Sequence, residues 1–158
     1  MRLVAFDFDG TLSDSEMTVL LGEQCGVADR MAAVTERAMN DEISYADSLR
    51  ERAALLDGLP LDDAANAFAQ VRLREGAADL LARLNDAGHH TAILTGGFER
   101  GVARALEREG VSVDTVVANR LPARGGHLTG DVEGPLIEGT KDEALESLAD
   151  DVGVPRSR

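Results

Sequence analysis

Residues 3–11 of this 158-residue chain read LVAFDFDGT, an apolar run followed by two aspartates, a glycine and a threonine. The apolar residues 3–6 are typical of a short buried strand of a parallel sheet, and the glycine predicts a turn after it. Asp7 and Asp9 alternate at the carboxyl end of this strand, so both can face the crevice where open α/β sheets bind ligands. Two such carboxylates repel each other unless a cation or shared proton relieves them, which indicates a Mg²⁺ site. A turn that is merely rich in aspartate is the competing interpretation.

The chain beyond this motif changes to helical character and then back to alternating strands and helices. Residues 13–74 place apolar residues at helical spacing, with a break at Leu59-Pro60, and predict an insertion of about four helices. Later helices are predicted over 77–87, 98–109 and 141–150, strands over 90–95 and 115–118, and a hairpin between 119 and 136. Strands separated by helices predict a parallel sheet. The predicted fold is α/β: a doubly wound parallel-sheet (Rossmann-like) core of residues 1–13 and 75–158 with an inserted helical cap of residues 14–74.

The composition narrows the classes of partner. Asp and Glu number 29 against 16 Lys and Arg, and the formal net charge of −13 repels nucleic acid and anionic membranes. No apolar run approaches the ~20 residues of a membrane span, and the N-terminus does not resemble a secretory signal. The one cysteine, Cys25, suits a reducing compartment and is expected in the core. We expect a cytoplasmic globular protein that binds neither nucleic acid nor membranes.

Lysine occurs once in the chain, at Lys141, and every other basic residue is arginine. High acid content with almost no lysine is typical of a protein kept soluble in concentrated salt, and codon bias toward arginine is the alternative explanation. A single lysine in an arginine-rich chain also indicates a position that requires a compact ammonium group. A solvated helix residue is the competing interpretation of Lys141.

A second motif, Thr95-Gly96-Gly97, follows the second predicted strand of the core. A hydroxyl and a glycine-rich turn at the start of a helix can present hydrogen-bond donors to an anion. A plain tight turn explains the same three residues equally well when they are taken alone.

The stretch Asp7-Phe8-Asp9-Gly10-Thr11 resembles the first motif of the haloacid dehalogenase-like phosphatases. The resemblance implies that Asp7 is the nucleophile that becomes an aspartyl phosphate, that Asp9 is the acid and base, and that both hold Mg²⁺. It implies that Thr95 and Gly96 form the second motif and Lys141 the third, which together bind the phosphoryl oxygens. A carboxylate nucleophile and a neighbouring acid are also the groups that a two-step phosphoryl displacement needs.

Residues of the predicted cap resemble those of the phosphoserine phosphatase subgroup of this family, namely Glu16, Met39 and residues 48–52, SLRER. Residues 118–121 and 128–134 resemble the hairpin region of the same subgroup. The resemblance implies that Glu16 pairs with the substrate ammonium and Arg52 with its carboxylate, an arrangement suited to a zwitterion. By spacing alone, solvated helix charges are an equally good interpretation of both residues. The activity implied is Mg²⁺-dependent hydrolysis of O-phosphoserine in serine biosynthesis.

The resemblance stops short of the fourth motif of the family, an acidic cluster that follows another strand. The sequence given ends at residues 154–158, where that strand is expected to begin. The expectation is a truncated chain with an incomplete Mg²⁺ site, in which the first strand is an edge prone to self-association. Two alternatives therefore remain: a related small-molecule phosphatase or phosphotransferase, and a truncated, catalytically inactive chain.

Overall fold

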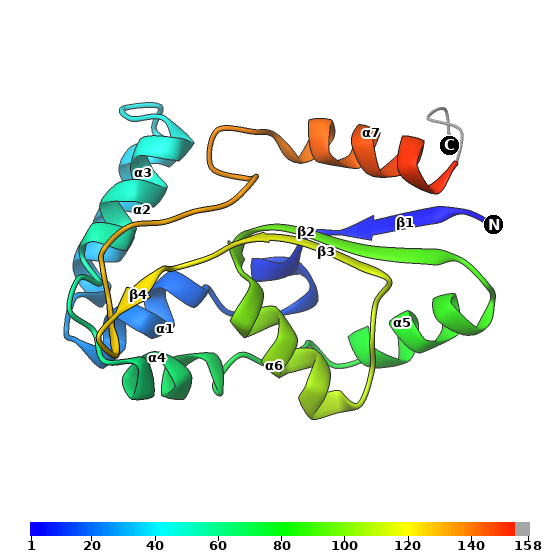
Figure 1. Ribbon diagram of the computed structural model, residues 1–158, viewed down its shortest axis with the longest axis horizontal. Coiled ribbons are helices and arrows are strands. Elements are labelled where there is room, and N and C mark those ends of the chain that lie inside the picture. Colours follow the sequence, from blue (N-terminus) through cyan, green and yellow to red (C-terminus); the bar gives the residue numbers. More distant parts are fainter. Residues whose placement is uncertain (154–158) are drawn as a thin grey trace.

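The computed structural model describes residues 1–153 and centres on a three-stranded parallel sheet. The strands lie in the order β1 (Leu3–Phe6), β2 (His90–Phe98) and β3 (Thr115–Asn119). Helix α7 (Lys141–Val152) covers one face of the sheet, and α5 (Ala77–Asp86) and α6 (Glu99–Glu109) cover the other (Figure 1). The predicted doubly wound α/β core is confirmed. Because parallel strands share one carboxyl-terminal edge, this order brings the residues that follow β1 and β2 together.

Four helices separate β1 from α5 and stand at one end of the sheet (Figure 1). They are α1 (Met17–Gln24), α2 (Ala28–Met39), α3 (Tyr45–Ala54) and α4 (Leu61–Phe68). Ser44 caps α3, since its side chain accepts a hydrogen bond from the Asp47 amide at 3.0 Å. Pro60 immediately precedes α4, in agreement with the predicted break. The helical insertion is therefore present, and the domain boundaries at residues 14 and 74 stay a prediction.

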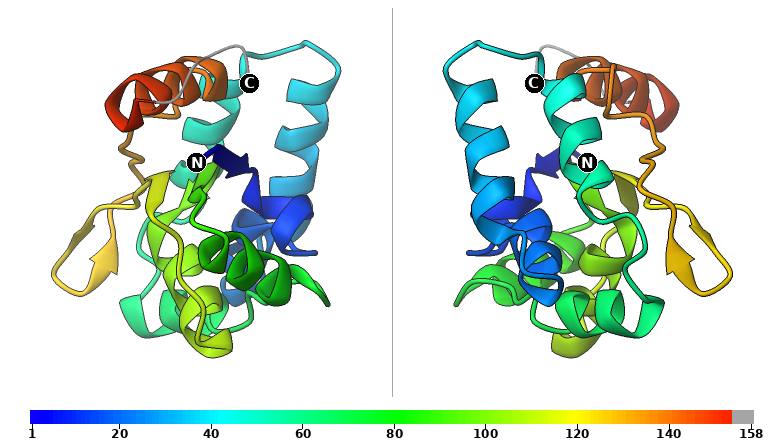
Figure 2. Two further views of the ribbon diagram at one scale, coloured as in Figure 1. Left: turned by 90° about the vertical axis from the view of Figure 1, so that its right-hand side faces the viewer. Right: turned by 90° about the vertical axis from the view of Figure 1, so that its left-hand side faces the viewer.

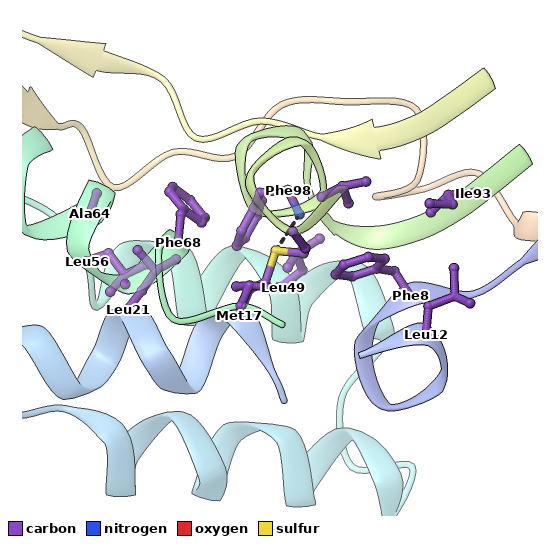
Figure 3. Packing of buried hydrophobic residues seen from close by; sticks show 14 of the residues in the cluster. Phe8, Leu12, Met17, Leu21, Leu49, Leu56, Ala64, Phe68, Ile93 and Phe98 are labelled. Atoms are coloured by element: carbon purple, nitrogen blue, oxygen red, sulfur yellow. Dashed lines mark hydrogen bonds between the residues drawn. The ribbon is translucent and has the colours of Figure 1, made fainter. Parts of the chain in front are cut away.

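The insertion and the sheet share one hydrophobic core. Met17 of α1 and Phe68 of α4 pack in the same buried cluster as Phe98 at the end of β2 (Figure 3). The Met17 sulfur accepts a hydrogen bond from the Phe98 amide at 3.3 Å, and all three residues are almost fully buried. A side chain at Gly101 would meet the end of the Met17 side chain, so glycine lets α6 approach α1 without displacing Met17. This packing holds the four helices over the carboxyl-terminal edge of the sheet.

The predicted hairpin is a short two-stranded ribbon, β4 (Ala123–Arg124) and β5 (His127–Leu128), turned at Gly125-Gly126. It stands out from the body of the molecule (yellow in Figure 2). The Leu128 amide donates to the Leu59 carbonyl at 2.8 Å, which ties the ribbon to the connection between α3 and α4. The chain then returns to α7, whose first residue is Lys141.

Three expectations need correction. Strand β1 is half-buried and not buried, because among residues 1–153 it pairs only with β2. Cys25 is exposed and not in the core, because it lies just after the last residue of α1. Phe98 ends β2 and does not begin the next helix, which starts at Glu99. The end of the chain, residues 154–158, lies outside the described residues, and self-association through β1 stays a prediction.

Candidate active site

A cavity of about 320 Å³ lies between the carboxyl-terminal edge of the sheet and three of the inserted helices, α1, α2 and α3. Its walls include every residue that the sequence singled out for a site: Asp7, Asp9, Glu16, Arg52, Thr95, Gly96 and Lys141. The first motif, the second motif and Lys141 come from the core, whereas Glu16 and Arg52 come from the insertion. The tertiary structure therefore gathers groups that are up to 134 residues apart, from Asp7 to Lys141, around one small space.

Asp7 lies directly after β1, where the chain enters a wide turn over residues 8–12. Gly10 has a φ of 74°, in the left-handed region that other residues avoid, and this conformation lets the chain reverse there. Phe8 is fully buried and anchors the turn in the core. Asp7 Oδ1 accepts a hydrogen bond from the Phe8 amide at 2.7 Å, and Oδ2 lies 2.8 Å from Lys141 Nζ. One oxygen of Asp7 is thus held by the backbone and the other by the only lysine of the chain.

Asp9 differs from Asp7 in having no cation beside it at ion-pair distance among residues 1–153. Burial, and to a smaller extent the negative charges of Glu16 and Asp7, raise the pKa of the Asp9 carboxyl to about 7. Its Oδ1 is buried and has no hydrogen-bond partner within the part of the chain that the structure describes. A carboxyl group with a pKa near neutral can both give and take a proton, as a general acid and base must.

The second motif ends β2 and borders the cavity on the core side. Thr95 is almost fully buried, and its hydroxyl oxygen accepts a hydrogen bond from the Gly97 amide at 2.9 Å. A side chain at Gly96 would collide with the Tyr45 hydroxyl, so this position requires glycine. Buried Asn119, at the end of β3, donates to the Gly96 carbonyl at 3.1 Å and accepts from the Leu136 amide at 3.0 Å. Asn119 thus connects the second motif to the segment that leads to Lys141. The sequence reading assigned Asn119 no role, and only its place in the resembling stretch 118–121 hinted at one.

Arg52 forms the centre of the cavity wall on the cap side. It is only 7% exposed. Its Nε donates to the Ser48 carbonyl at 3.3 Å and its Nη1 donates to the Thr18 hydroxyl at 3.4 Å. The guanidinium carbon lies 5.9 Å from the centre of the Tyr45 ring. Arg50, two residues earlier, does not border the cavity and pairs with Glu138 at 2.6 Å.

Three further residues of the cavity wall, Thr18, Tyr45 and Ser48, were not singled out as site residues from the sequence. Tyr45, Ser48 and Arg52 stand at helical spacing on one face of α3, and this spacing was the signal available for two of them. Glu16 immediately precedes the first residue of α1, is exposed to solvent and borders the cavity. Its acidic side chain and the Arg52 guanidinium give the cap wall both signs of charge.

Comparison with known proteins agrees with this geometry. Residues 4–157 match the haloacid dehalogenase-like hydrolases. The chain belongs to this hydrolase family. Among the relatives of this hydrolase, a phosphoserine phosphatase of Halobacterium salinarum is 58% identical over 153 residues, which cover 97% of this chain and 72% of that protein. The family resemblance seen in the sequence is confirmed.

Solved structures of related hydrolases have the same fold. A phospho-aspartyl intermediate analogue of phosphoserine phosphatase superimposes with a TM-score of 0.88 at 35% identity, covering 98% of this chain and 73% of that one. A substrate-bound phosphoserine phosphatase complex has a TM-score of 0.88 at 34% identity, with the same coverage of 98% and 73%. Both likenesses extend through the cap as well as the core, because they cover almost the whole of this chain.

Asp7 and Asp9, the two carboxylates predicted to hold Mg²⁺, both border the cavity. Within residues 1–153 no group of three or more His, Cys, Asp or Glu side chains could hold one. Mg²⁺ keeps several waters and is commonly bound through one or two carboxylates together with substrate phosphate, so a pair of carboxylates is compatible with it. Over the same residues, no helix is both long enough and apolar enough to cross a membrane.

Proposed function

We propose that this hydrolase is a Mg²⁺-dependent phosphoserine phosphatase, which converts O-phosphoserine to serine and phosphate through an aspartyl phosphate. One observation carries the proposal: a single cavity joins the Asp7, Asp9 and Lys141 cluster to Glu16 and Arg52. The first three residues suit phosphoryl transfer, and the last two suit the ammonium and carboxylate of an amino acid. The likeness to phosphoserine phosphatases over nearly the whole chain supports the same substrate.

The geometry accounts for the first half of the reaction. Lys141, the Thr95 hydroxyl and the Gly96 backbone border the space beside Asp7 and would hold the phosphoryl oxygens. The Asp7 carboxylate attacks phosphorus, the bond from phosphorus to the serine oxygen breaks, and Asp9 gives its proton to that oxygen. The raised pKa of Asp9, about 7, keeps this proton available near neutral pH. Serine leaves, and the phosphoryl group remains on Asp7.

The second half reverses the role of Asp9. Its carboxylate, now deprotonated, takes a proton from a water molecule, and that water attacks phosphorus. The bond from phosphorus to Asp7 breaks, phosphate leaves, and both carboxylates return to their starting states. The two aspartates divide the work because Asp7 is paired with Lys141 at 2.8 Å, whereas burial lets Asp9 carry a proton.

The chemistry of the donor set fits Mg²⁺. Asp9 Oδ1 is buried without a partner among the described residues, and an uncompensated carboxylate oxygen of this kind suits a cation. Asp7 and Asp9 would hold the ion, and its charge would offset that of the phosphoryl oxygens when it is bound. A role in serine biosynthesis and a place in the cytoplasm belong to the same proposal, and the single cysteine suits a reducing compartment.

The proposal is tested by trapping the intermediate. Acid-quenched protein incubated with Mg²⁺ and phosphoserine labelled at phosphorus should carry label, and the Asp7→Asn variant should carry none, because an amide lacks the charge needed to attack. Asp14→Asn is the matched control, since Asp14 is an exposed aspartate of the same segment outside the cavity. Equal labelling of the Asp7→Asn variant, or no phosphate release from phosphoserine by the unaltered chain, would overturn the proposal.

A further inference from the structure

The hydroxyl of Ser48 is a buried polar group that the mechanism above does not use. Ser48 is fully buried, lines the cavity from α3, and its Oγ has no hydrogen-bond partner among the described residues. A serine inside a helix commonly donates back to the carbonyl four residues earlier, but the Ser48 hydroxyl makes no such bond within residues 1–153, and the Ser44 carbonyl accepts the Ser48 amide at 2.9 Å. Buried hydroxyls without a partner are rare in folded proteins, so Ser48 points to a ligand group that it meets in the cavity.

Arg52 lies one helical turn further along α3. Like the Ser48 hydroxyl, its positive charge lacks a partner among the described residues, in this case an anionic one. Arg52 is almost fully buried, yet it forms no ion pair with any residue of the range 1–153. Two of its nitrogens donate to the Ser48 carbonyl and the Thr18 hydroxyl, and neither acceptor is an anion. A guanidinium group has five N–H donors, so others remain for a ligand. A buried guanidinium without a carboxylate partner favours an anionic ligand.

Thr18 fixes the direction of this guanidinium. It lies on α1, is almost fully buried and lines the same cavity. Its hydroxyl oxygen accepts from Arg52 Nη1 while the Ser48 carbonyl accepts from Nε, so the guanidinium is held between two helices. An aliphatic residue at position 18 could not make this bond, and the Arg52 side chain would gain rotational freedom.

We propose that Ser48 and Arg52 form one subsite for the substrate carboxylate and that Thr18 is the positioning residue for Arg52. In this subsite the Ser48 hydroxyl donates one hydrogen bond to the carboxylate, and the guanidinium donates the others. The inference rests on the proposed function and deepens it, because it assigns recognition of the amino-acid carboxylate to a hydroxyl as well as to the arginine.

The test uses two non-hydrolysable phosphonates that differ only in the carboxylate: 2-amino-3-phosphonopropionate, which has it, and 2-aminoethylphosphonate, which lacks it. Binding of each to the full chain is measured by titration calorimetry with Mg²⁺ present. Ser48→Ala should weaken binding of the carboxylate probe roughly tenfold, the usual loss for one hydrogen bond to a charged group, and change the other probe less than twofold. Ser48→Cys, whose thiol is a weak donor, should give an intermediate loss.

The Thr18 variants test positioning separately from binding. Thr18→Val should weaken binding of the probe that carries the carboxylate by about threefold or more. Thr18→Ser, which keeps a hydroxyl at this position, should retain most of the affinity. Thr91→Val is the matched control, because Thr91 is a buried threonine of β2 outside the cavity whose hydroxyl donates to Asn85 at 2.9 Å. It removes a buried hydroxyl and should leave the affinity ratio of the two probes unchanged.

Each alternative has its own outcome. Equal losses for both probes would show that Ser48 only shapes the cavity wall, and no loss for either would show that water satisfies its hydroxyl, so both results would overturn the inference. Failure of the proposed function gives a different result: the unaltered chain would then bind the two phosphonates equally. Thermal unfolding followed by circular dichroism identifies any variant that is not folded. If the Ser48 variants do not fold, the comparison of Thr18→Val with Thr18→Ser tests the subsite in their place.

Discussion

At the scale of single residues, the two aspartates of the first motif differ in whether a positively charged side chain lies beside them. Lys141 Nζ lies 2.8 Å from Asp7 Oδ2, so the negative charge of Asp7 has a direct partner. Asp9 has none at that distance among the described residues, and its Oδ1 is buried and unbonded. Burial of the Asp9 carboxyl therefore costs stability when its charge is not compensated.

Replacing Asp9 should accordingly stabilise the metal-free protein. The pKa of Asp9 is raised from 3.8 to about 7, so the folded state binds its proton more tightly than the unfolded state does. The stability contributed by this group is present below its unfolded pKa and is lost as the pH rises through about 7. At pH 8, Asp9→Asn should raise the Tm in EDTA by roughly 2–6 °C, which corresponds to about 1–2 kcal/mol.

The controls for this measurement are pH and position. At pH 5 the difference should shrink, because folded Asp9 already holds its proton there. Exposed Asp14, changed to Asn, should shift the Tm by less than a degree or so. A lower Tm for Asp9→Asn at pH 8 would contradict this account of the carboxylate.

At the scale of elements, the site depends on how closely the start of α3 approaches the end of β2. The Tyr45 hydroxyl occupies the space in which a side chain at Gly96 would lie. Asn119 holds the Gly96 carbonyl from the side of β3, and Arg50 pairs with Glu138 at 2.6 Å ahead of α7. The inserted helices and the core thus meet directly at the Gly96 backbone, which borders the proposed site of the phosphoryl group.

This approach predicts a rescue between two elements. Gly96→Ala should lower kcat/KM for phosphoserine at least tenfold, because misplacing a binding group by 1 Å can cost about 10²-fold. Adding Tyr45→Phe removes the hydroxyl that the new methyl group meets and should restore part of the loss. Tyr45→Phe alone is the control. A double variant no more active than Gly96→Ala would show that the contact does not limit activity.

At the scale of the whole molecule, the excess of acidic residues is the main source of electrostatic repulsion. The net charge is −13, and surface ion pairs such as Arg37–Glu51 and Arg120–Glu99 are well exposed to solvent. Repulsion of this kind destabilises a compact state and is screened by salt. The similarity to the Halobacterium salinarum phosphatase agrees with the interpretation that this protein is adapted to concentrated salt.

The Tm should therefore rise as KCl is raised from low to molar concentration at pH 7.5, because screening weakens the repulsion among carboxylates. The same titration near pH 4.5, the isoelectric point expected from the sequence, is the control and should show a much smaller rise. A flat or falling Tm at pH 7.5 would remove the explanation by salt adaptation and leave codon bias as the reason for the scarce lysine.

Local features of this protein could be predicted from the sequence because their causes lie within a few residues. The strand before Asp7, the turn that needs Gly10, the Ser44 cap and the helix end at Gly110 follow from neighbouring side chains and backbone preferences. The two motifs could be placed together because parallel strands present their ends at one edge, whereas Lys141 was placed with them by the family resemblance. For Glu16 and Arg52, spacing left the interpretation open, and only the family resemblance indicated the cavity.

Other features depended on which distant segments meet, and no local pattern carries that information. Cys25 lies in an apolar stretch but is exposed because α1 ends before it, and β1 is apolar but half-buried because β2 covers only one of its edges among residues 1–153. The raised pKa of Asp9 and the unbonded hydroxyl of Ser48 arise from burial where the cap closes over the sheet. Burial and electrostatic environment belong to the packed molecule, since solvent is excluded by residues remote in the chain.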